Sequence, residues 1–232
     1  MRIADKYAQT DTEKAELNAV SLFANAETAF ENHCANLIVK AYFKALEEGK
    51  FQASWNEVTI TRHLKKHLKI CILEEALQYF VAPEYPEDDD NIDDGIKNAA
   101  EEVYFDLIFS SFSNASQHYF GVEAKIVIEN DYLKRKATVE ISEYVSKKGM
   151  RKFLESVYKK RGCMLGYLIE GSADTVVLKI NDKIKADIFY ENTGLLEKGE
   201  PIDGFEQYYE SVHLNYSRNP LRHFFLNIAL KN

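Results

Sequence analysis

The sequence predicts an α/β protein with a mixed β-sheet flanked by helices and an N-terminal helical layer. Apolar residues recur at three- and four-residue spacing through residues 12–48, as in an amphipathic helix. Residues 103–109 and 119–127 are short and rich in β-branched and aromatic side chains, which is typical of strands. A third apolar run, residues 163–171, comes after a segment with a helical pattern and is expected to be a buried strand.

The helical layer is predicted to comprise residues 1–52, and residues 53–232 are expected to form the core. One apolar stripe of the first helix consists of Phe30, Cys34, Leu37, Ala41 and Ala45. Such a stripe packs within the chain or pairs with a second copy in a homodimer, and the sequence leaves both alternatives open. A second helical run is predicted to begin with Asn56 as its N-cap and to continue through Phe80, and the sequence leaves open a break within it.

The two predicted strands form a hairpin across the turn-forming stretch SFSNASQ. Because side chains alternate along a strand, Glu123 and Lys125 share one face of the strand at 119–127. Asp106 lies in the preceding strand at 103–109. Cross-strand neighbours are roughly 5 Å apart, so its carboxylate is expected to reach the same place as that of Glu123.

After the hairpin, residues 146–160 are predicted to be helical, and Gly162 marks the end of that helix. The apolar stripe of this helix consists of Met150, Phe153, Leu154 and Val157. Residues 163–171 are then expected to lie parallel to an earlier strand after the helical crossover. Residues 205–230 predict a strand, a turn and a final apolar element.

Two carboxylates and a lysine at this spacing predict hydrolysis of phosphodiesters. Mg²⁺ prefers oxygen ligands and is commonly held by one or two carboxylates, here Asp106 and Glu123. Lys125 can orient or help deprotonate the attacking water and offset charge that develops on the phosphorane. The metal would activate the water and polarise the phosphoryl group.

An Asp followed seventeen residues later by Glu-x-Lys on a strand resembles the PD-(D/E)xK phosphodiesterase superfamily, which includes the type II restriction endonucleases. The resemblance covers about residues 55–180 and departs from the pattern at Phe105, where proline is usual. It implies a restriction endonuclease-like fold, Mg²⁺ or Mn²⁺ as cofactor, and cleavage of DNA in preference to RNA. The implied setting is bacterial restriction or anti-phage defence.

The resemblance also implies two further metal ligands. The carbonyl of Ala124 is expected to complete the metal shell, and a glutamate on the first core helix often contacts it. Glu57, Glu74 and Glu75 are the candidates, and we favour Glu57 because it opens that helix. The helix macrodipole also stabilises an acidic residue at a helix N-terminus, which is an alternative reason for Glu57 at this position.

Other functions stay open at this point. An exposed strand face with a cross-strand ion pair is the plainer explanation of the Glu-x-Lys tripeptide. The chain is alternatively a catalytically inactive nucleic-acid-binding or accessory subunit of a defence complex, with a partner protein subunit. A third alternative is a helical interaction module with an incidental hairpin.

The net charge of −8 has a local origin. Residues 83–102 contain nine carboxylates and one lysine, so this segment has a net charge of −8, the same as that of the whole chain. We expect a solvated acidic loop there; it would alternatively occupy a basic groove or collect cations. Residues 133–161 contain ten cationic and three acidic residues, a patch that attracts nucleic acid. The predicted nucleic-acid contacts are Lys134, Arg135, Lys136, Lys147, Lys148, Arg151 and Lys152.

The remaining signals are weak. His63 and His67 have the spacing of a metal-binding pair on a helix, but no third ligand is evident. A basic surface that contacts phosphates is an alternative, and we expect a solvated face there. The three cysteines lack the spacing of a disulfide framework or a zinc site. No apolar run is long enough to span a membrane, and no signal peptide is evident, so a cytoplasmic location is expected.

Overall fold

The computed structural model describes residues 11–86, 104–113, 116–155, 161–191, 193–213 and 220–229. The elements, in chain order, are α1 (Asp11–Glu47), α2 (Glu57–Glu74), β1 (Tyr79–Pro86), β2 (Tyr104–Ser113), β3 (Ser116–Ile128), α4 (Ala137–Val145), α5 (Arg151–Leu154), β4 (Gly162–Glu170), α6 (Ala173–Ala186), the 3₁₀ turn η3 (Ile188–Tyr190), β5 (Glu197–Lys198), β6 (Tyr208–Ser211) and β7 (Leu221–Asn227).

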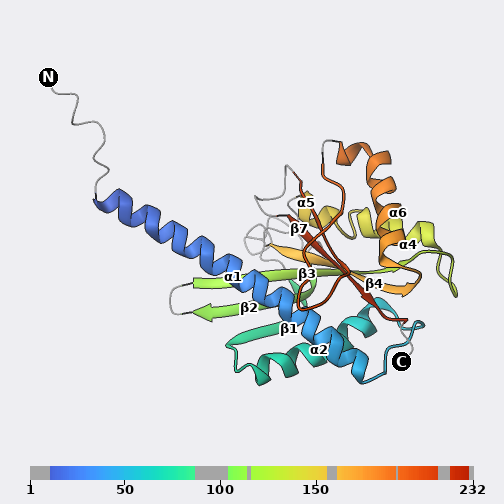
Figure 1. The fold of residues 1–232 in the computed structure, drawn as a ribbon, viewed down its shortest axis with the longest axis horizontal. Coiled ribbons are helices and arrows are strands. Elements are labelled where there is room, and N and C mark those ends of the chain that lie inside the picture. The colour runs from blue at the N-terminus through green and yellow to red at the C-terminus, as the bar shows by residue number, and fades with distance from the viewer. Residues whose placement is uncertain are drawn as a thin grey trace, which may run out of the picture.

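The strands form one mixed sheet of seven strands in the order β1-β2-β3-β4-β7-β6-β5 (Figure 1). The first three strands are antiparallel, and β4 lies parallel to both β3 and β7. The parallel β3–β4 pair is joined by a crossover that contains α4 and α5, as a parallel connection requires. The α/β class with a mixed sheet is confirmed, and the alternative of a helical module with an incidental hairpin is wrong.

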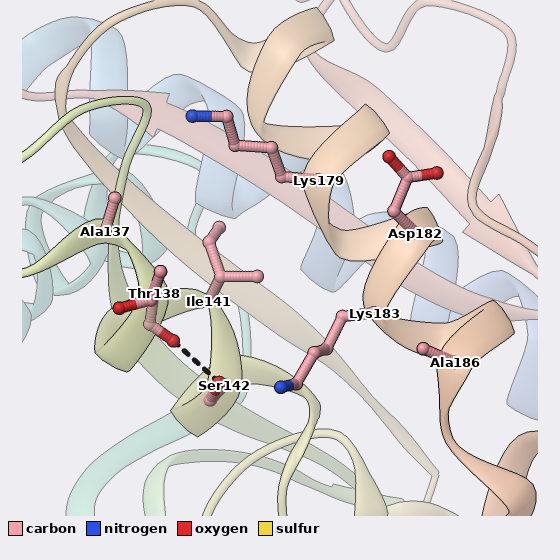
Figure 2. A pocket seen from close by; sticks show the side chains of 8 residues that line it. All are labelled: Ala137, Thr138, Ile141, Ser142, Lys179, Asp182, Lys183 and Ala186. Carbon is pink, nitrogen blue, oxygen red and sulfur yellow. Dashed lines mark hydrogen bonds between the residues drawn. The ribbon is translucent and has the colours of Figure 1, made fainter.

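One face of the sheet is covered by α4, α5 and α6 (Figure 1). Tyr144 and Ile180 are fully buried there against strand residues such as Phe225. The predicted apolar residues Met150, Phe153 and Leu154 belong to the same cluster. A cavity of about 410 Å³ lies between α4 and α6 (Figure 2), lined in part by Ile141, Ser142, Lys179 and Lys183.

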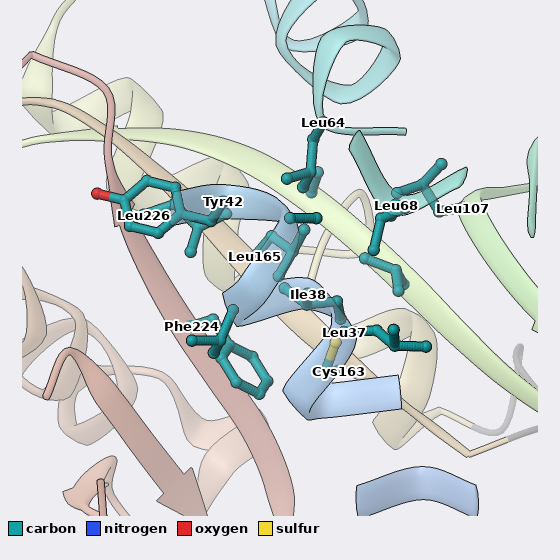
Figure 3. Packing of buried hydrophobic residues seen from close by; sticks show 14 of the residues in the cluster. Leu37, Ile38, Tyr42, Leu64, Leu68, Leu107, Cys163, Leu165, Phe224 and Leu226 are labelled. Carbon is teal, nitrogen blue, oxygen red and sulfur yellow. The ribbon is translucent and has the colours of Figure 1, made fainter. Parts of the chain in front are cut away.

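The opposite face is covered by α1 and α2, as Figure 3 shows for Leu37, Ile38 and Tyr42 of α1. The five residues of the predicted stripe are all buried within the chain: Phe30, Cys34, Leu37, Ala41 and Ala45. Core packing is therefore the correct alternative for these side chains, and they are not available to a second copy.

The crossover between β3 and β4 differs from the helix predicted over residues 146–160. Its main helix is α4, which ends where Ser146 is the C-cap. A Cβ on Gly149 would lie 2.3 Å from the backbone oxygen of Tyr144, so the chain makes a glycine-dependent turn there. The β-branched residues of α4 weakened its helical signal in the sequence. Residues 156–160, including Val157, lie outside the described residues.

The segment after α2 also differs from the expectation. The helix ends at Glu74, and a turn containing Ala76 at φ 52° leads into β1. The predictions of helix through Phe80 and of an acidic loop beginning at Pro83 are therefore wrong. Because β1 is an edge strand, it tolerates Pro83 and Pro86. The remainder of the acidic segment, residues 87–102, lies outside the described residues.

Candidate active site

The candidate site lies where β2 and β3 stop pairing. The β2–β3 ladder ends where Leu107 faces Val122, one residue before Asp106 would face Glu123. Beyond that point the Oδ2 atom of Asp106 accepts a hydrogen bond of 2.7 Å from the backbone N–H of Ala124. The Asp106 carboxylate therefore replaces a strand carbonyl, which satisfies the amide and fixes the position of the carboxylate.

One ammonium group lies among all four predicted metal ligands. The Nζ atom of Lys125 is 2.9 Å from Oε1 of Glu123, 3.1 Å from Oε1 of Glu57 and 4.0 Å from Oδ2 of Asp106. It also donates a 2.6 Å hydrogen bond to the carbonyl of Ala124. We refer to Glu57, Asp106, Glu123, Ala124 and Lys125 as the Lys125 cluster.

Glu123 is the most deeply buried member of the cluster. Its side chain is 1% exposed, whereas that of Asp106 is 27% exposed. Both oxygens of Glu123 accept 2.9 Å hydrogen bonds from Nζ of Lys152 on α5. With every group ionised, three carboxylates and two ammonium groups leave one net negative charge. Solvent therefore reaches the site at Asp106 and at Glu57, whose side chain is also 27% exposed, and not at Glu123.

Burial and mutual repulsion alter the acid–base properties of the cluster. Burial, with a further contribution from the Glu123 charge, raises the pKa of Asp106 to about 7. Burial also raises the pKa of Glu57. For Lys125, burial lowers the pKa, but the charges of Glu123, Glu57 and Asp106 outweigh it and raise the pKa above its usual value. Lys125 is therefore an ammonium ion at neutral pH.

Glu57 reaches the cluster because the start of α2 is held firmly. Asn56 caps the helix, and its side chain accepts a 2.9 Å hydrogen bond from the backbone N–H of Thr59. Arg135, in the loop after β3, donates hydrogen bonds to the carbonyls of Ala53 and Trp55. These contacts tie the segment before α2 to the end of β3.

The other two acidic candidates lie at the opposite end of α2. Glu74 pairs with Lys44, and Glu75 pairs with His33 and Lys40 of α1. Their contacts connect the two helices. Of the three candidates, only Glu57 contacts Lys125.

The predicted nucleic-acid-binding residues divide into two groups. Those that are partly buried and held by groups of the protein are Arg135, Arg151 and Lys152; Arg151 pairs with Glu155 and lies 3.8 Å from the centre of the Phe189 ring. Those that are exposed are Lys134, Lys136, Lys147 and Lys148, of which Lys136 pairs with Asp131 and Lys148 with Glu143 at the surface. Any nucleic-acid contact in this region therefore rests mainly on the exposed lysines.

A second cluster was missed in the sequence. Among the described residues, Glu48, His63 and His67 form a group in which the ligand atoms all lie within 4.8 Å of one another, close enough to hold a metal ion. The expectation of a solvated face with no third ligand is wrong, because the side chains of His63 and His67 are only 11% and 7% exposed. Burial lowers the pKa of His63. Glu48 was missed because it follows α1 and no sequence spacing relates it to the histidines.

His213 and His223 belong to a buried hydrogen-bonded group in the core. Ser211 Oγ lies 2.7 Å from Nε2 of His213 and 2.8 Å from Nε2 of His223, and Tyr144 contacts the second ring nitrogen of His223. All four residues are buried. The three cysteines, Cys34, Cys71 and Cys163, are buried and free. None of the described helices is both long and apolar enough to cross a bilayer.

No family model matches this chain, and no curated protein or solved structure matches it either. The function of this chain is therefore inferred from its own geometry and chemistry.

Proposed function

We propose that this protein is a Mg²⁺-dependent nuclease that hydrolyses phosphodiester bonds of DNA. The observation that carries the proposal is the convergence of Asp106, Glu123, Glu57 and the Ala124 carbonyl on Nζ of Lys125, at 2.6 to 4.0 Å. Because three carboxylates and a carbonyl oxygen surround this ammonium group, the site favours a positive charge.

The donor set suits Mg²⁺ or Mn²⁺. Three carboxylates and a carbonyl are hard oxygen ligands, and no nitrogen or sulfur ligand belongs to the Lys125 cluster. Asp106 and Glu123 would hold the ion, with Glu57 and the carbonyl of Ala124 as further ligands. When bound, the ion supplies charge that activates water and polarises the phosphoryl group.

The residues of the chain prepare the site for this chemistry. Asp106 is held by the Ala124 amide, and its partial exposure leaves it accessible to a phosphate group. Because its pKa is raised, Lys125 stays an ammonium ion at neutral pH, so it donates hydrogen bonds and does not act as a base. Its ammonium group would align the attacking water and offset negative charge on the phosphorane. Lys152 holds Glu123 in place from α5.

The supporting architecture agrees with the resemblance to the PD-(D/E)xK superfamily. A helix that carries Glu57 precedes three antiparallel strands, and a helical crossover leads to a parallel fourth strand. The resemblance favours a role in bacterial restriction or anti-phage defence.

The test is Mg²⁺-dependent cleavage of double- and single-stranded DNA and of RNA. We expect Asp106→Ala and Lys125→Ala to lower cleavage by at least about 100-fold, which is typical for loss of one electrostatic or acid–base contribution. Glu57→Ala is expected to weaken cleavage, whereas Glu74→Ala, a matched change on the same helix, leaves it unchanged. Undiminished cleavage by folded Asp106→Ala protein would reject this site.

One observation favours a second candidate function. Glu123 is already paired with two lysines, Lys125 and Lys152, so its charge is balanced without a metal. A non-catalytic nucleic-acid-binding or accessory subunit would keep this pairing as structure. That function predicts binding of nucleic acid that does not depend on a divalent cation and no cleavage by the wild-type protein with Mg²⁺ or Mn²⁺.

A further inference from the structure

The cluster of Glu48, His63 and His67 joins the end of α1 to the middle of α2. Glu48 is the first residue after α1, and the two histidines are one helical turn apart on α2. Nε2 of His67 lies 2.9 Å from Oε2 of Glu48, and Nε2 of His63 lies 3.5 Å from the same oxygen. Three potential ligand atoms therefore face one another across the helix–helix contact.

The histidine nearest the aromatic side chains is incompletely satisfied. The buried Nε2 atom of His63 has no hydrogen-bond partner in the described part of the chain. Its ring is enclosed by Phe51 and Trp55, whose ring centres lie 5.1 and 5.4 Å away. A buried polar atom without a partner is costly, and such atoms in native proteins often indicate an ion or water.

The spacing of the three atoms suits a small tetrahedral ion. With metal–ligand bonds of about 2.1 Å, neighbouring ligand atoms of a tetrahedral Zn²⁺ site are about 3.4 Å apart. The two nitrogen–oxygen distances in this cluster, 2.9 and 3.5 Å, bracket that value. The ligand atoms of the two histidines lie within 4.8 Å of each other, so binding would draw the two rings to the spacing that the nitrogen–oxygen pairs already have.

The ligand types determine the class of ion. Two imidazole nitrogens favour Zn²⁺ and related transition metals, whereas Mg²⁺ and Ca²⁺ prefer sites made only of oxygen. The segment between the histidines is Leu64, Lys65 and Lys66, so it carries no glutamate that could serve as the general base of a zinc protease. The cluster therefore lacks the zinc-protease motif.

Two lysines orient the carboxylate of Glu48. Its Oε1 atom accepts 2.7 Å hydrogen bonds from both Lys50 and Lys66, and Lys66 also lies 3.0 Å from Oε2. The two lysines thus hold Oε1 on the solvent side of the carboxylate, and Oε2 faces the two histidines. Outer contacts of this kind orient metal ligands, although the lysine charges will reduce the affinity for a cation.

We propose that Glu48, His63 and His67 bind one divalent transition-metal ion of the Zn²⁺ class, which fastens the end of α1 to α2. Water completes the coordination, because no fourth His, Cys, Asp or Glu ligand among the described residues shares this spacing. The ion would close the segment 48–63 and so steady the start of α2, where Glu57 lies. The site is separate from the Lys125 cluster and does not depend on the proposed nuclease activity.

The test is a titration of metal-stripped protein with Zn²⁺, followed by calorimetry and by thermal unfolding. We expect one Zn²⁺ per chain beyond any bound at the Lys125 cluster, and a higher Tm when it binds. Glu48→Gln and His67→Ala should each weaken this binding by more than about 100-fold, because loss of an outer contact alone typically costs about 10- to 100-fold. Co²⁺ bound in place of Zn²⁺ should give visible d–d absorption without the near-ultraviolet band of a thiolate ligand.

Three controls make the result decisive. His33→Ala removes a histidine that pairs with Glu75 on the same helix pair and should leave Zn²⁺ binding intact. Asp106→Asn separates any ion at the Lys125 cluster from this one. Glu48, at 24% exposure, can be changed to Gln without a cavity, so a folding defect of the histidine variants does not confound the test. Absence of stoichiometric Zn²⁺ binding, or equal binding by folded Glu48→Gln protein, overturns the proposal.

Discussion

The Nζ atom of Lys125 lies 3.1 Å from Oε1 of Glu57, although the two residues are 68 positions apart. Lys125 lies on β3 in the sheet, and Glu57 opens the helix that covers the sheet from one side. Lys152 reaches the same group of carboxylates from α5 on the other side. The site therefore lies in the gap where β2 and β3 stop pairing, and both layers of helices contribute to it.

Replacing Lys125 tests whether the ammonium group stands in for a cation. Lys125→Met should lower the free energy of unfolding in EDTA by about 3 kcal/mol, because it leaves buried carboxylates without their partner. Mg²⁺ should then raise the Tm of the variant more than that of the wild type, as measured by thermal unfolding. Lys136→Met, which breaks an exposed pair with Asp131, should change neither quantity. Equal responses of Lys125→Met and wild type to Mg²⁺ would contradict the prediction.

The raised pKa of Asp106 makes stability depend on pH. The folded protein holds the Asp106 proton up to about pH 7, whereas the unfolded chain releases it near the ordinary value of 3.8. The folded state thus binds more protons between these values, and stability falls as the pH rises from about 4 to about 7.

Asp106→Asn should remove this fall while keeping the hydrogen bond from Ala124. Without divalent ions at pH 8, we expect the variant to be more stable than the wild type by about 2 to 4 kcal/mol, since one pKa unit corresponds to about 1.4 kcal/mol. At pH 4 the two proteins should be similar. Urea unfolding at both pH values measures the difference, and parallel pH profiles would show that Asp106 titrates normally.

Arg135 and Lys134 are adjacent but should behave differently. Arg135→Ala removes two hydrogen bonds to the carbonyls before α2 and should cost about 1 to 3 kcal/mol of stability. Lys134→Ala changes an exposed residue and should leave stability unchanged. In a DNA-binding assay Lys134→Ala should weaken affinity and lower its salt dependence. A stable Arg135→Ala protein would refute the structural role of Arg135.

Gly162 and Gly49 are required for different reasons, the first for space beside a neighbouring strand and the second for its backbone conformation. A Cβ on Gly162 would lie 2.0 Å from the backbone oxygen of Gly121 on the neighbouring strand, so Gly162→Ala should cost about 3 kcal/mol or more. Gly49 has open space around it but a φ of +65°, so Gly49→Ala should cost only about 1 kcal/mol. Chemical denaturation of both variants checks the order, and a reversed order would mean that β3 and β4 can separate locally.

Local patterns in the chain were sufficient for the elements whose neighbours are near in sequence. Alternation along β3 predicted that Glu123 and Lys125 share a face, and the cap at Asn56 predicted the start of α2. Both signals arise from the local backbone geometry of a single strand or helix, so neighbouring residues in the sequence are enough to predict them.

Only the tertiary structure decided which distant groups meet. Lys152 was predicted to contact nucleic acid but holds Glu123, and Glu48 joins two histidines with which it shares no sequence motif. Both meetings depend on how helices pack against the sheet and against each other. Side-chain partners across such contacts follow from the packing of whole layers, which no short stretch of sequence encodes.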